Sequence, residues 1–251
     1  MILVFGGTTE GKKVAALLES LAMPFVYSTK TKICFQETEV ASYAHGALDE
    51  EQLERFLMAN KVKIIINAAH PFAEVLHGTI AKVAQRLQLP VIRFGRKLLP
   101  QIVHPLVFYV NTYEDALALL KENQRLLALT GVQSIEKIKS WWQNHPTYVR
   151  ILDRPASWAM AAASNFPKKQ LILGLPSDDL EKEIDLIQTH QIDVILTKET
   201  GNSGFLSTKI EAALKTNTQI MIINQPKIPT YFEVVYQVDE LALFIAKTRV
   251  I

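Results

Sequence analysis

The segment 197–204, with sequence TKETGNSG, brings glycines, hydroxyl side chains and a lysine together between a short apolar run and a helical pattern. A loop that joins a strand to a helix points backbone N–H groups at a ligand beyond the carboxyl end of the strand. Lys198 adds a positive charge that suits a phosphate or a carboxylate. Hydroxyl groups and close backbone approach would come from Thr200, Gly201 and Ser203. The segment predicts an anion-binding loop, and a solvated loop is the alternative.

A second glycine-rich turn follows the apolar run 2–5, and its sequence at 6–11 is GGTTEG. Its spacing differs from the G-x-G-x-x-G fingerprint of dinucleotide folds, although the glycines still permit a tight turn. Either threonine can cap the following helix, and Glu10 in its first turn favours the helix dipole but would repel a phosphate. We interpret the turn as a cofactor contact, against the alternative of a capped turn without a ligand. The candidate residues are Gly6, Gly7, Thr8, Thr9 and Glu10.

Two further strand ends carry candidate residues. The buried run 64–66 is followed by NAAHPF at 67–72. Because proline is favourable at the first helical position, we expect Pro71 to begin a helix and His70 to lie near its N-cap, close to the negative charge of a ligand. His70 is therefore either a functional residue or a structural loop histidine. Thr130 and Gly131 end another predicted strand, and this position is the only reason to consider them as ligand contacts.

Cations follow several of the predicted strands. Lys30 and Lys32 come after the second strand, where nucleotide folds meet the adenosine ribose, so they suit a 2′-phosphate or are a solvated pair. Arginines near the strand ends could bind carboxylates in a bidentate manner, and the candidates are Arg93, Arg96, Arg150 and Arg154. Lys209 lies one turn into the helix that follows the 197–204 loop.

The elements that position these residues alternate between strand and helix along nearly the whole chain. Apolar runs without alternation predict strands of parallel sheets covered on both faces. The predicted strands are 2–5, 25–28, 64–66, a run from 90, 107–110, 126–129, 148–151, 171–173, 194–196 and 220–223. Thr112 and Asp115 form a capping-box-like helix start.

The segment 96–105, with two prolines and no clear period, breaks the alternation and predicts a domain boundary. We expect an α/β protein of two doubly wound, parallel-sheet (Rossmann-like), three-layer domains, 1–98 and 105–251, facing each other across an interdomain cleft.

Composition excludes several classes of protein. The single cysteine, Cys34, excludes an internal disulfide and a cysteine-based zinc site, and the six histidines lack metal-site spacing, so we expect no protein-bound metal. A net charge of +2 gives no argument for nucleic acid. No secretory signal and no apolar stretch near the ~18 residues of a membrane helix occur, which favours a cytoplasmic protein. Oligomeric state is not readable from the sequence.

Several catalytic motifs are absent as well. The chain has no G-x-x-x-x-G-K-[ST] motif and no G-x-S-x-G motif, which argues against a P-loop NTPase and an α/β-hydrolase. It also has no Tyr-x-x-x-Lys pair of the short-chain dehydrogenase kind.

Taken in order, these loops resemble those of the precorrin-6A reductases, which include the cobalt-precorrin-6A reductases of anaerobic cobalamin synthesis. The resemblance spans nearly the whole chain. It rests on GGTTEG at 6–11, HPFA at 70–73, LTG at 129–131, YVRILDRP at 148–155, TKETGNSG at 197–204 and KIEAA at 209–213. Members often carry Asp and Thr where this chain has Asn67 and Ala69, and many have a Gly-rich stretch that 30–39 lacks.

The resemblance implies a two-domain enzyme that uses NADPH to reduce a macrocycle double bond and converts cobalt-precorrin-6A to cobalt-precorrin-6B. The tetrapyrrole substrate would carry its own cobalt. Its proton would come from His70, from Lys198 or from solvent. The residues expected to bind its carboxylates are Arg93, Arg150, Lys198 and Lys209, and those expected at the cofactor include Lys30, Thr130, Gly131, Thr200, Gly201 and Ser203 besides the 6–10 turn.

Three alternatives stay open at this point. The substrate could be metal-free precorrin-6A, although the short chain and the missing Gly-rich stretch favour the cobalt branch. The scaffold could serve another NAD(P)-dependent reductase. The chain could also be a non-catalytic tetrapyrrole or nucleotide carrier.

Overall fold

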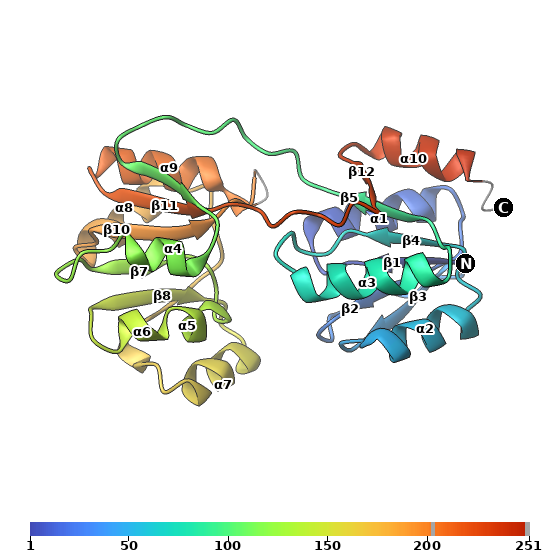
Figure 1. Ribbon diagram of the computed structural model, residues 1–251, viewed down its shortest axis with the longest axis horizontal. Helices are drawn as coiled ribbons and strands as arrows, with labels where there is room; N and C mark the ends of the chain where they lie inside the picture. The colour runs from blue at the N-terminus through green and yellow to red at the C-terminus, as the bar shows by residue number, and fades with distance from the viewer. Residues whose placement is uncertain (202–203, 249–251) are drawn as a thin grey trace. The chain divides into compact units, whose positions relative to one another are not determined.

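The structure is a computed structural model that describes residues 1–201 and 204–248. These residues form two compact units (Figure 1). The second unit is continuous, Leu98–Gln225, and the first combines Met1–Lys97 with the chain from Pro226 onward.

Six parallel strands form the sheet of the first unit, in the order β12-β5-β4-β1-β2-β3. The strands are β1 (Ile2–Phe5), β2 (Phe25–Thr29), β3 (Ala41–His45), β4 (Ile64–Asn67), β5 (Val91–Phe94) and β12 (Glu233–Val235). The helices are α1 (Thr9–Ser20), α2 (Glu50–Ala59), α3 (Glu74–Arg86) and α10 (Val238–Lys247).

Both faces of this sheet are covered, which explains why its central strands β1, β2, β4 and β5 are buried at every position and mostly apolar. Ile2 and Val4 pack with α1 and α10 on one face, whereas Leu3 and Phe5 pack with α2 and α3 on the other. The first unit therefore has three layers, as predicted.

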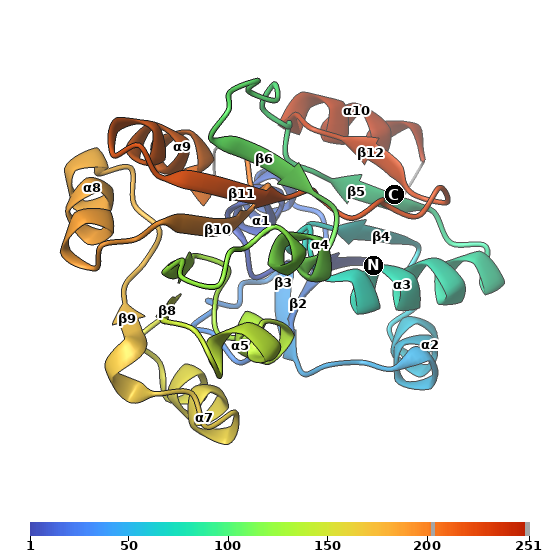
Figure 2. The same ribbon diagram turned by 60° about the vertical axis from the view of Figure 1, so that its left-hand side comes forward.

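The second unit repeats the arrangement, with parallel strands in the order β6-β11-β10-β7-β8-β9. The strands are β6 (Val107–Val110), β7 (Leu126–Ala128), β8 (Thr147–Ile151), β9 (Leu171–Leu173), β10 (Val194–Lys198) and β11 (Gln219–Ile223). The helices are α4 (Tyr113–Ala118), α5 (Ser134–Lys137), α6 (Lys139–Trp142), α7 (Pro155–Ala163), α8 (Leu180–Thr189) and α9 (Leu206–Lys215), with a 3₁₀ turn at Lys168–Gln170. Figure 2 shows α8 and α9 beside β10 and β11, and their apolar residues share one core cluster with those strands.

The strand order reverses at one place in each sheet. In the first unit the chain runs outward from β1 through β2 to β3 and then returns to β4 on the other side of β1. In the second unit it runs from β7 through β8 to β9 and returns to β10 beside β7. Such switch points are where doubly wound sheets bind ligands. The loops after β1 and β4 therefore adjoin, and so do the loops after β7 and β10.

The predicted α/β class and the parallel sheets are confirmed, as are two helix starts. The side chain of Thr8 caps α1 by accepting a hydrogen bond from Gly11 N–H, and Thr112 forms a capping box with Asp115. The short strands β3 and β12 were not predicted. Both are edge strands, and polar or exposed residues weaken their apolar pattern.

The predicted division into 1–98 and 105–251 differs from the structure at the end of the chain. Residues from Pro226 onward belong to the first unit, not the second. The reason is strand pairing: β12 lies parallel to β5 with Val235 opposite Phe94, and α10 packs against α1. No described helix has the length and apolar composition needed to cross a membrane.

Leu241 of α10 is fully buried in the core beside α1, whereas Leu243 is 63% exposed. We expect Leu241→Ala to lower the free energy of unfolding by about 2–5 kcal/mol, because the substitution leaves a cavity in the first unit. The matched variant Leu243→Ala should change it by less than about 0.5 kcal/mol. Urea unfolding of both variants measures the difference, and equal effects would contradict the placement of α10.

Candidate functional site

The turn after β1 is built around the side chain of Tyr27 on β2. Gly7 N–H donates to the Tyr27 hydroxyl at 2.9 Å, and Gly6 N–H donates to the carbonyl of Ser28 at 2.9 Å. A Cβ at Gly6 would overlap the Tyr27 ring, and one at Gly11 would meet its hydroxyl at 2.6 Å. Glycines at 6 and 11 are therefore required by the packing of the protein's own tyrosine.

Thr8 joins this turn to the loop after β4. Its hydroxyl donates to the carbonyl of Ala68 at 2.7 Å and accepts from Gly11 N–H at 3.0 Å. Gly7 and Thr9 are the exposed residues of the turn, so they are the members of the predicted set that face solvent. Of the two threonines considered as caps, Thr8 is the one that caps the helix.

Glu10, predicted as a cofactor contact, is buried instead and forms an ion pair with Arg96 at 2.8 Å. Both side chains are almost wholly buried, and the ion pair gives each buried charge a counter-charge. A buried pair of this kind is costly to break, because removal of one partner strands the other charge. The pairing also balances the acid that would otherwise repel a phosphate at this helix start.

Below the loop after β4 lies a buried network of Asn67, His77 and Arg93. Arg93 Nη1 donates to the carbonyls of Asn67 (3.0 Å) and Ala69 (2.8 Å) and to Asn67 Oδ1 (3.2 Å). Asn67 Nδ2 lies 2.9 Å from His77 Nδ1, and His77 Nε2 lies 3.2 Å from the carbonyl of Pro71. Since the amide donates and the carbonyl accepts, the imidazole is neutral with its proton on Nε2.

Burial lowers the pKa of His77 to about 4, and the nearby charge of Arg93 acts in the same direction. Burial also lowers the pKa of Arg93 to about 10, with a further lowering by Arg96 that Glu10 opposes. Arg93 was predicted to bind a substrate carboxylate, but the structure uses it to hold backbone carbonyls inside the unit.

His70 lies above this network and is partly exposed. The expected helix start is wrong here: α3 begins at Glu74 with Ala73 as N-cap, and 70–73 form a turn closed by Ala73 N–H to the carbonyl of His70 at 2.9 Å. His70 Nδ1 accepts from Phe72 N–H at 3.2 Å, so the proton of the neutral ring is on Nε2.

The switch point of the second unit brings Lys198 and Thr130 together. Lys198, the last residue of β10, donates from Nζ to the carbonyl of Thr130 at 3.1 Å, and its charge lies 6.0 Å from the centre of the Tyr113 ring. The Thr130 hydroxyl donates to Ser134 Oγ at 2.6 Å. Gly131 follows with φ +84°, a conformation that favours glycine.

The 199–204 loop is fastened at Glu199, whose buried carboxylate accepts from Gln225 N–H at 2.9 Å. Thr200 packs its hydroxyl against the α-carbon of Gly204, where a Cβ would overlap it. Gly201 has φ +61° and is buried. Ser203, predicted as a cofactor contact, lies outside the described residues.

Arg150 and Lys209, predicted to bind substrate, are instead drawn into the second unit with Glu183. Arg150 forms a buried ion pair with Glu183, and Lys209 donates from Nζ to the carbonyl of Gly204 at 2.8 Å. Burial lowers the pKa of Lys209 to about 8, and the charge of Arg150 lowers it further while Glu183 opposes the change. Lys209 therefore ties α9 to the preceding loop, and Arg150 ties β8 to α8.

Lys30 and Lys32 are exposed directly after β2, at the carboxyl edge of the first sheet. Together with the exposed Gly7 and Thr9 of the neighbouring turn, this donor set suits the phosphates of a dinucleotide that carries a 2′-phosphate. Within the described residues, no group of three or more His, Cys, Asp or Glu side chains could hold a metal ion.

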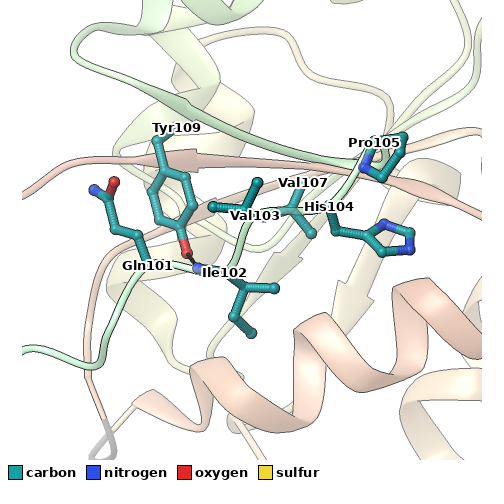
Figure 3. Close-up of a pocket in the computed structure, with 7 residues that line it drawn as sticks. All are labelled: Gln101, Ile102, Val103, His104, Pro105, Val107 and Tyr109. Atoms are coloured by element: carbon teal, nitrogen blue, oxygen red, sulfur yellow. Dashed lines mark hydrogen bonds between the residues drawn. The ribbon is translucent and has the colours of Figure 1, made fainter.

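A shallow recess of about 450 Å³ lies beside β6, at the start of this edge strand (Figure 3). It is lined by Gln101, Ile102, Val103, His104, Pro105, Val107 and Tyr109. The Tyr109 hydroxyl accepts from Ile102 N–H at 3.0 Å, so its polar group is engaged in holding the segment before β6. A lining residue, Gln101, donates from Nε2 to Asn224 Oδ1 at 3.4 Å, directly after β11.

Sequence reasoning missed the roles of Tyr27 and His77. Tyr27 follows Phe25 and Val26 in a short apolar run, so the sequence indicates a core residue. His77 does carry a signal, because it falls at helical spacing with the buried Ile80 and Ala84 of α3. A histidine in an apolar stripe predicts burial and therefore hydrogen-bond partners at both ring nitrogens.

Comparison with known proteins gives a consistent result. Residues 1–246 match the family described as Precorrin-6x reductase CbiJ/CobK. The chain is 27% identical to a cobalt-precorrin-6A reductase of Methanocaldococcus jannaschii, with 99% of each chain covered, and 28% identical to one of Priestia megaterium, with 91% of each covered. A precorrin-6A reductase of Rhodococcus erythropolis is 26% identical over 98% of this chain and 96% of its own. The solved structure of CobK precorrin-6A reductase superposes with a TM-score of 0.82 at 18% identity, covering 99% of this chain and 97% of the other, and shows the same fold.

The depressed pKa of His77 makes a prediction for acid stability. In the unfolded chain the imidazole binds a proton near pH 6.5, but the folded protein admits one only near pH 4, so the unfolded state holds more protons between these values. The free energy of unfolding should therefore fall as the pH drops from about 6.5 to about 4, by roughly 3 kcal/mol from this group, and be unaffected by it above pH 7.

The measurement is urea unfolding of the protein and of His77→Gln across this pH range. The variant lacks the titrating group, so its curve should be flatter by that amount. Parallel curves for the two proteins would contradict the buried neutral imidazole.

Proposed function

The chain belongs to the precorrin-6x reductase family, and from this membership we propose that it uses NADPH to reduce cobalt-precorrin-6A to cobalt-precorrin-6B. Membership makes the chain a precorrin-6A reductase of cobalamin biosynthesis. Two points go beyond membership and are proposed here: the nicotinamide cofactor is NADPH, and the substrate contains cobalt.

The observation that carries the proposal is the match of residues 1–246 to this family. The cobalt form is supported by relatives named cobalt-precorrin-6A reductases, which align over more than nine-tenths of the chain. The cobalt arrives with the small tetrapyrrole substrate, so the protein itself needs no metal ligands.

NADPH as the donor is supported by the exposed cations after β2. Lys30 and Lys32 lie at the edge where a parallel sheet of this order receives the ribose of a nucleotide, and two positive charges favour a 2′-phosphate there. We propose that Gly6, Gly7, Thr8 and Thr9 form the turn that faces the nucleotide. For the second unit, we propose the same kind of contact for Thr130, Gly131, Thr200 and Gly201.

When bound, NADPH supplies a hydride to one carbon of the macrocycle double bond, and a proton must reach the neighbouring carbon. We propose His70 as the proton donor, through Nε2 of its imidazolium form; the neutral ring of the structure, whose Nδ1 accepts from Phe72 N–H, is the resting form that takes up this proton. Lys198 is the second candidate; its ammonium group donates to the Thr130 carbonyl, and its positive charge suits a substrate carboxylate.

The buried cations take a different part. Since Arg93, Arg150 and Lys209 hold carbonyls or a carboxylate inside their units, we propose that they maintain the loops and do not touch substrate. Of the four residues predicted to bind substrate, Lys198 is then the one proposed to meet a carboxylate of the tetrapyrrole.

The direct test is anaerobic oxidation of NADPH, followed by the absorbance of the reduced nicotinamide, with cobalt-precorrin-6A and metal-free precorrin-6A compared. Rapid oxidation with the cobalt form is the expected result. A preference for the metal-free form would reverse the choice of substrate. NADPH that binds but is not oxidised with either macrocycle would favour a carrier, or a reductase for a different substrate.

The nucleotide preference can be tested with the double variant Lys30→Ala/Lys32→Ala. Loss of charged hydrogen bonds worth about 1.5–3 kcal/mol should raise the KM for NADPH by tenfold or more and leave the KM for NADH unchanged. The control is Lys63→Ala, since Lys63 is exposed at the opposite, amino end of β4. An unaltered ratio of the two KM values would exclude the 2′-phosphate contact.

The two proton-donor candidates predict different kinetics. If His70 donates the proton, His70→Ala should lower kcat by about 10²–10⁴-fold with little change in KM, whereas Lys198→Met should mainly raise the KM for the macrocycle. Steady-state kinetics separates these outcomes. Full turnover in His70→Ala with loss in Lys198→Met would transfer the role to Lys198, and full turnover in both would leave the proton to solvent.

A further inference from the structure

We propose that His77 is a positioning residue for His70, acting with Asn67 and Arg93 to fix the 67–71 turn from inside the first unit. The inference rests on the proposed function in one respect, namely that His70 delivers the proton. It assigns a role to His77, a buried residue that is not itself proposed to touch substrate or cofactor.

The network grips the turn at both ends. His77 Nδ1 meets the Asn67 side chain where β4 ends, and His77 Nε2 meets the carbonyl of Pro71 directly after His70. One imidazole thereby spans the segment that carries His70, and it does so from a helix whose own packing is fixed by the buried Ile80.

Arg93 holds the middle of the same segment. A single guanidinium nitrogen donates to the carbonyls of Asn67 and Ala69 and to the Asn67 side-chain oxygen. That oxygen also accepts from Ala69 N–H at 3.2 Å. With its oxygen used in this way, the Asn67 amide can present only its NH₂ group to His77, which requires an unprotonated Nδ1.

A side chain of similar volume without nitrogens could not replace His77. Leucine would fill the space but would leave the Asn67 NH₂ group and the Pro71 carbonyl buried without partners. The arrangement also resists protonation, because a proton on Nδ1 would face the Asn67 NH₂ group beside the charge of Arg93.

The position of this segment also determines the orientation of the His70 ring. Its Nδ1 is held by the N–H of Phe72, the residue that follows Pro71. A shift of the Pro71 carbonyl therefore moves the peptide that orients the His70 ring and redirects Nε2. Misplacement of a reacting group by about 1 Å costs on the order of 10²-fold in rate, so this alignment is where His77 acts.

Three substitutions of His77 test the proposal: two half-variants, which each keep one of its two hydrogen bonds, and one variant that keeps neither. His77→Gln keeps a donor at the position of Nε2, His77→Asn keeps an acceptor at the position of Nδ1, and His77→Leu keeps neither. We expect His77→Leu to lower kcat by about 10²-fold with both KM values nearly constant, and the half-variants to restore part of it. His104→Gln, which changes an exposed histidine of the second unit, is the control and should match the unaltered protein.

To test whether His77 acts through His70, the same His77 substitutions are made in the His70→Ala variant. If His77 acts through His70, His77→Leu should cause no further loss of kcat there. An equal loss in both backgrounds would overturn the proposal, as would full activity of His70→Ala or of His77→Leu. Thermal unfolding, run in parallel, identifies an assay temperature at which every variant is folded.

A second readout does not depend on turnover. With ¹⁵N-labelled histidine, the NMR shifts of the His77 ring should report a neutral Nε2–H form near pH 6, and the His70 ring shifts should change in His77→Leu and return toward their original values in His77→Gln. Unchanged His70 shifts would overturn the positioning role. If the unaltered protein failed to oxidise NADPH with either macrocycle, the proposed function would fall, and these spectra would still decide whether His77 positions His70.

Discussion

The parallel alignment of β1 with β4 and of β7 with β10 is the constraint on which both candidate regions depend. Because parallel strands end at the same edge, reversal of the strand order beside β1 and beside β7 gathers two loops at one place in each sheet. Thr8 then reaches the Ala68 carbonyl across the first switch point, and Lys198 reaches the Thr130 carbonyl across the second. Residues about 60 to 68 positions apart become neighbours through sheet order alone.

Buried charge in both units serves the backbone of these loops. Arg93 donates to two carbonyls of the 67–69 segment, and Lys209 donates to the carbonyl at the end of the 199–204 loop. Withdrawing a cation from water is unfavourable unless hydrogen bonds replace its hydration. The carbonyls supply those bonds, so each loop is tied to a charge that cannot leave without exposing unpaired groups. Lys30 and Lys32 show the opposite case, since exposed cations stay available for a ligand.

The sequence predicts the strands, the two sheets and the loops at the switch points well, because apolar runs in covered parallel strands are strong signals. It also predicts the cap at Thr112 and a threonine cap at position 8 or 9, both of which depend on neighbours three residues away. Burial of Arg93 and Lys209 could not be foreseen, since a cation at a strand end or in a first helical turn looks the same whether it faces solvent or a carbonyl. β12 could not be foreseen either, because three residues become a strand only through pairing with β5.

That pairing bears on how the chain is made. β5 is synthesised before the second unit and its partner β12 after it, so the first sheet lacks its sixth strand and the cover of α10 until the second unit has been synthesised. The second unit is continuous and can fold as soon as it has left the ribosome. The first unit is therefore completed after the second has been made, and the pairing of β5 with β12 closes a loop of about 140 residues. Chain entropy slows this step, and prior folding of the second unit brings the two strands closer together.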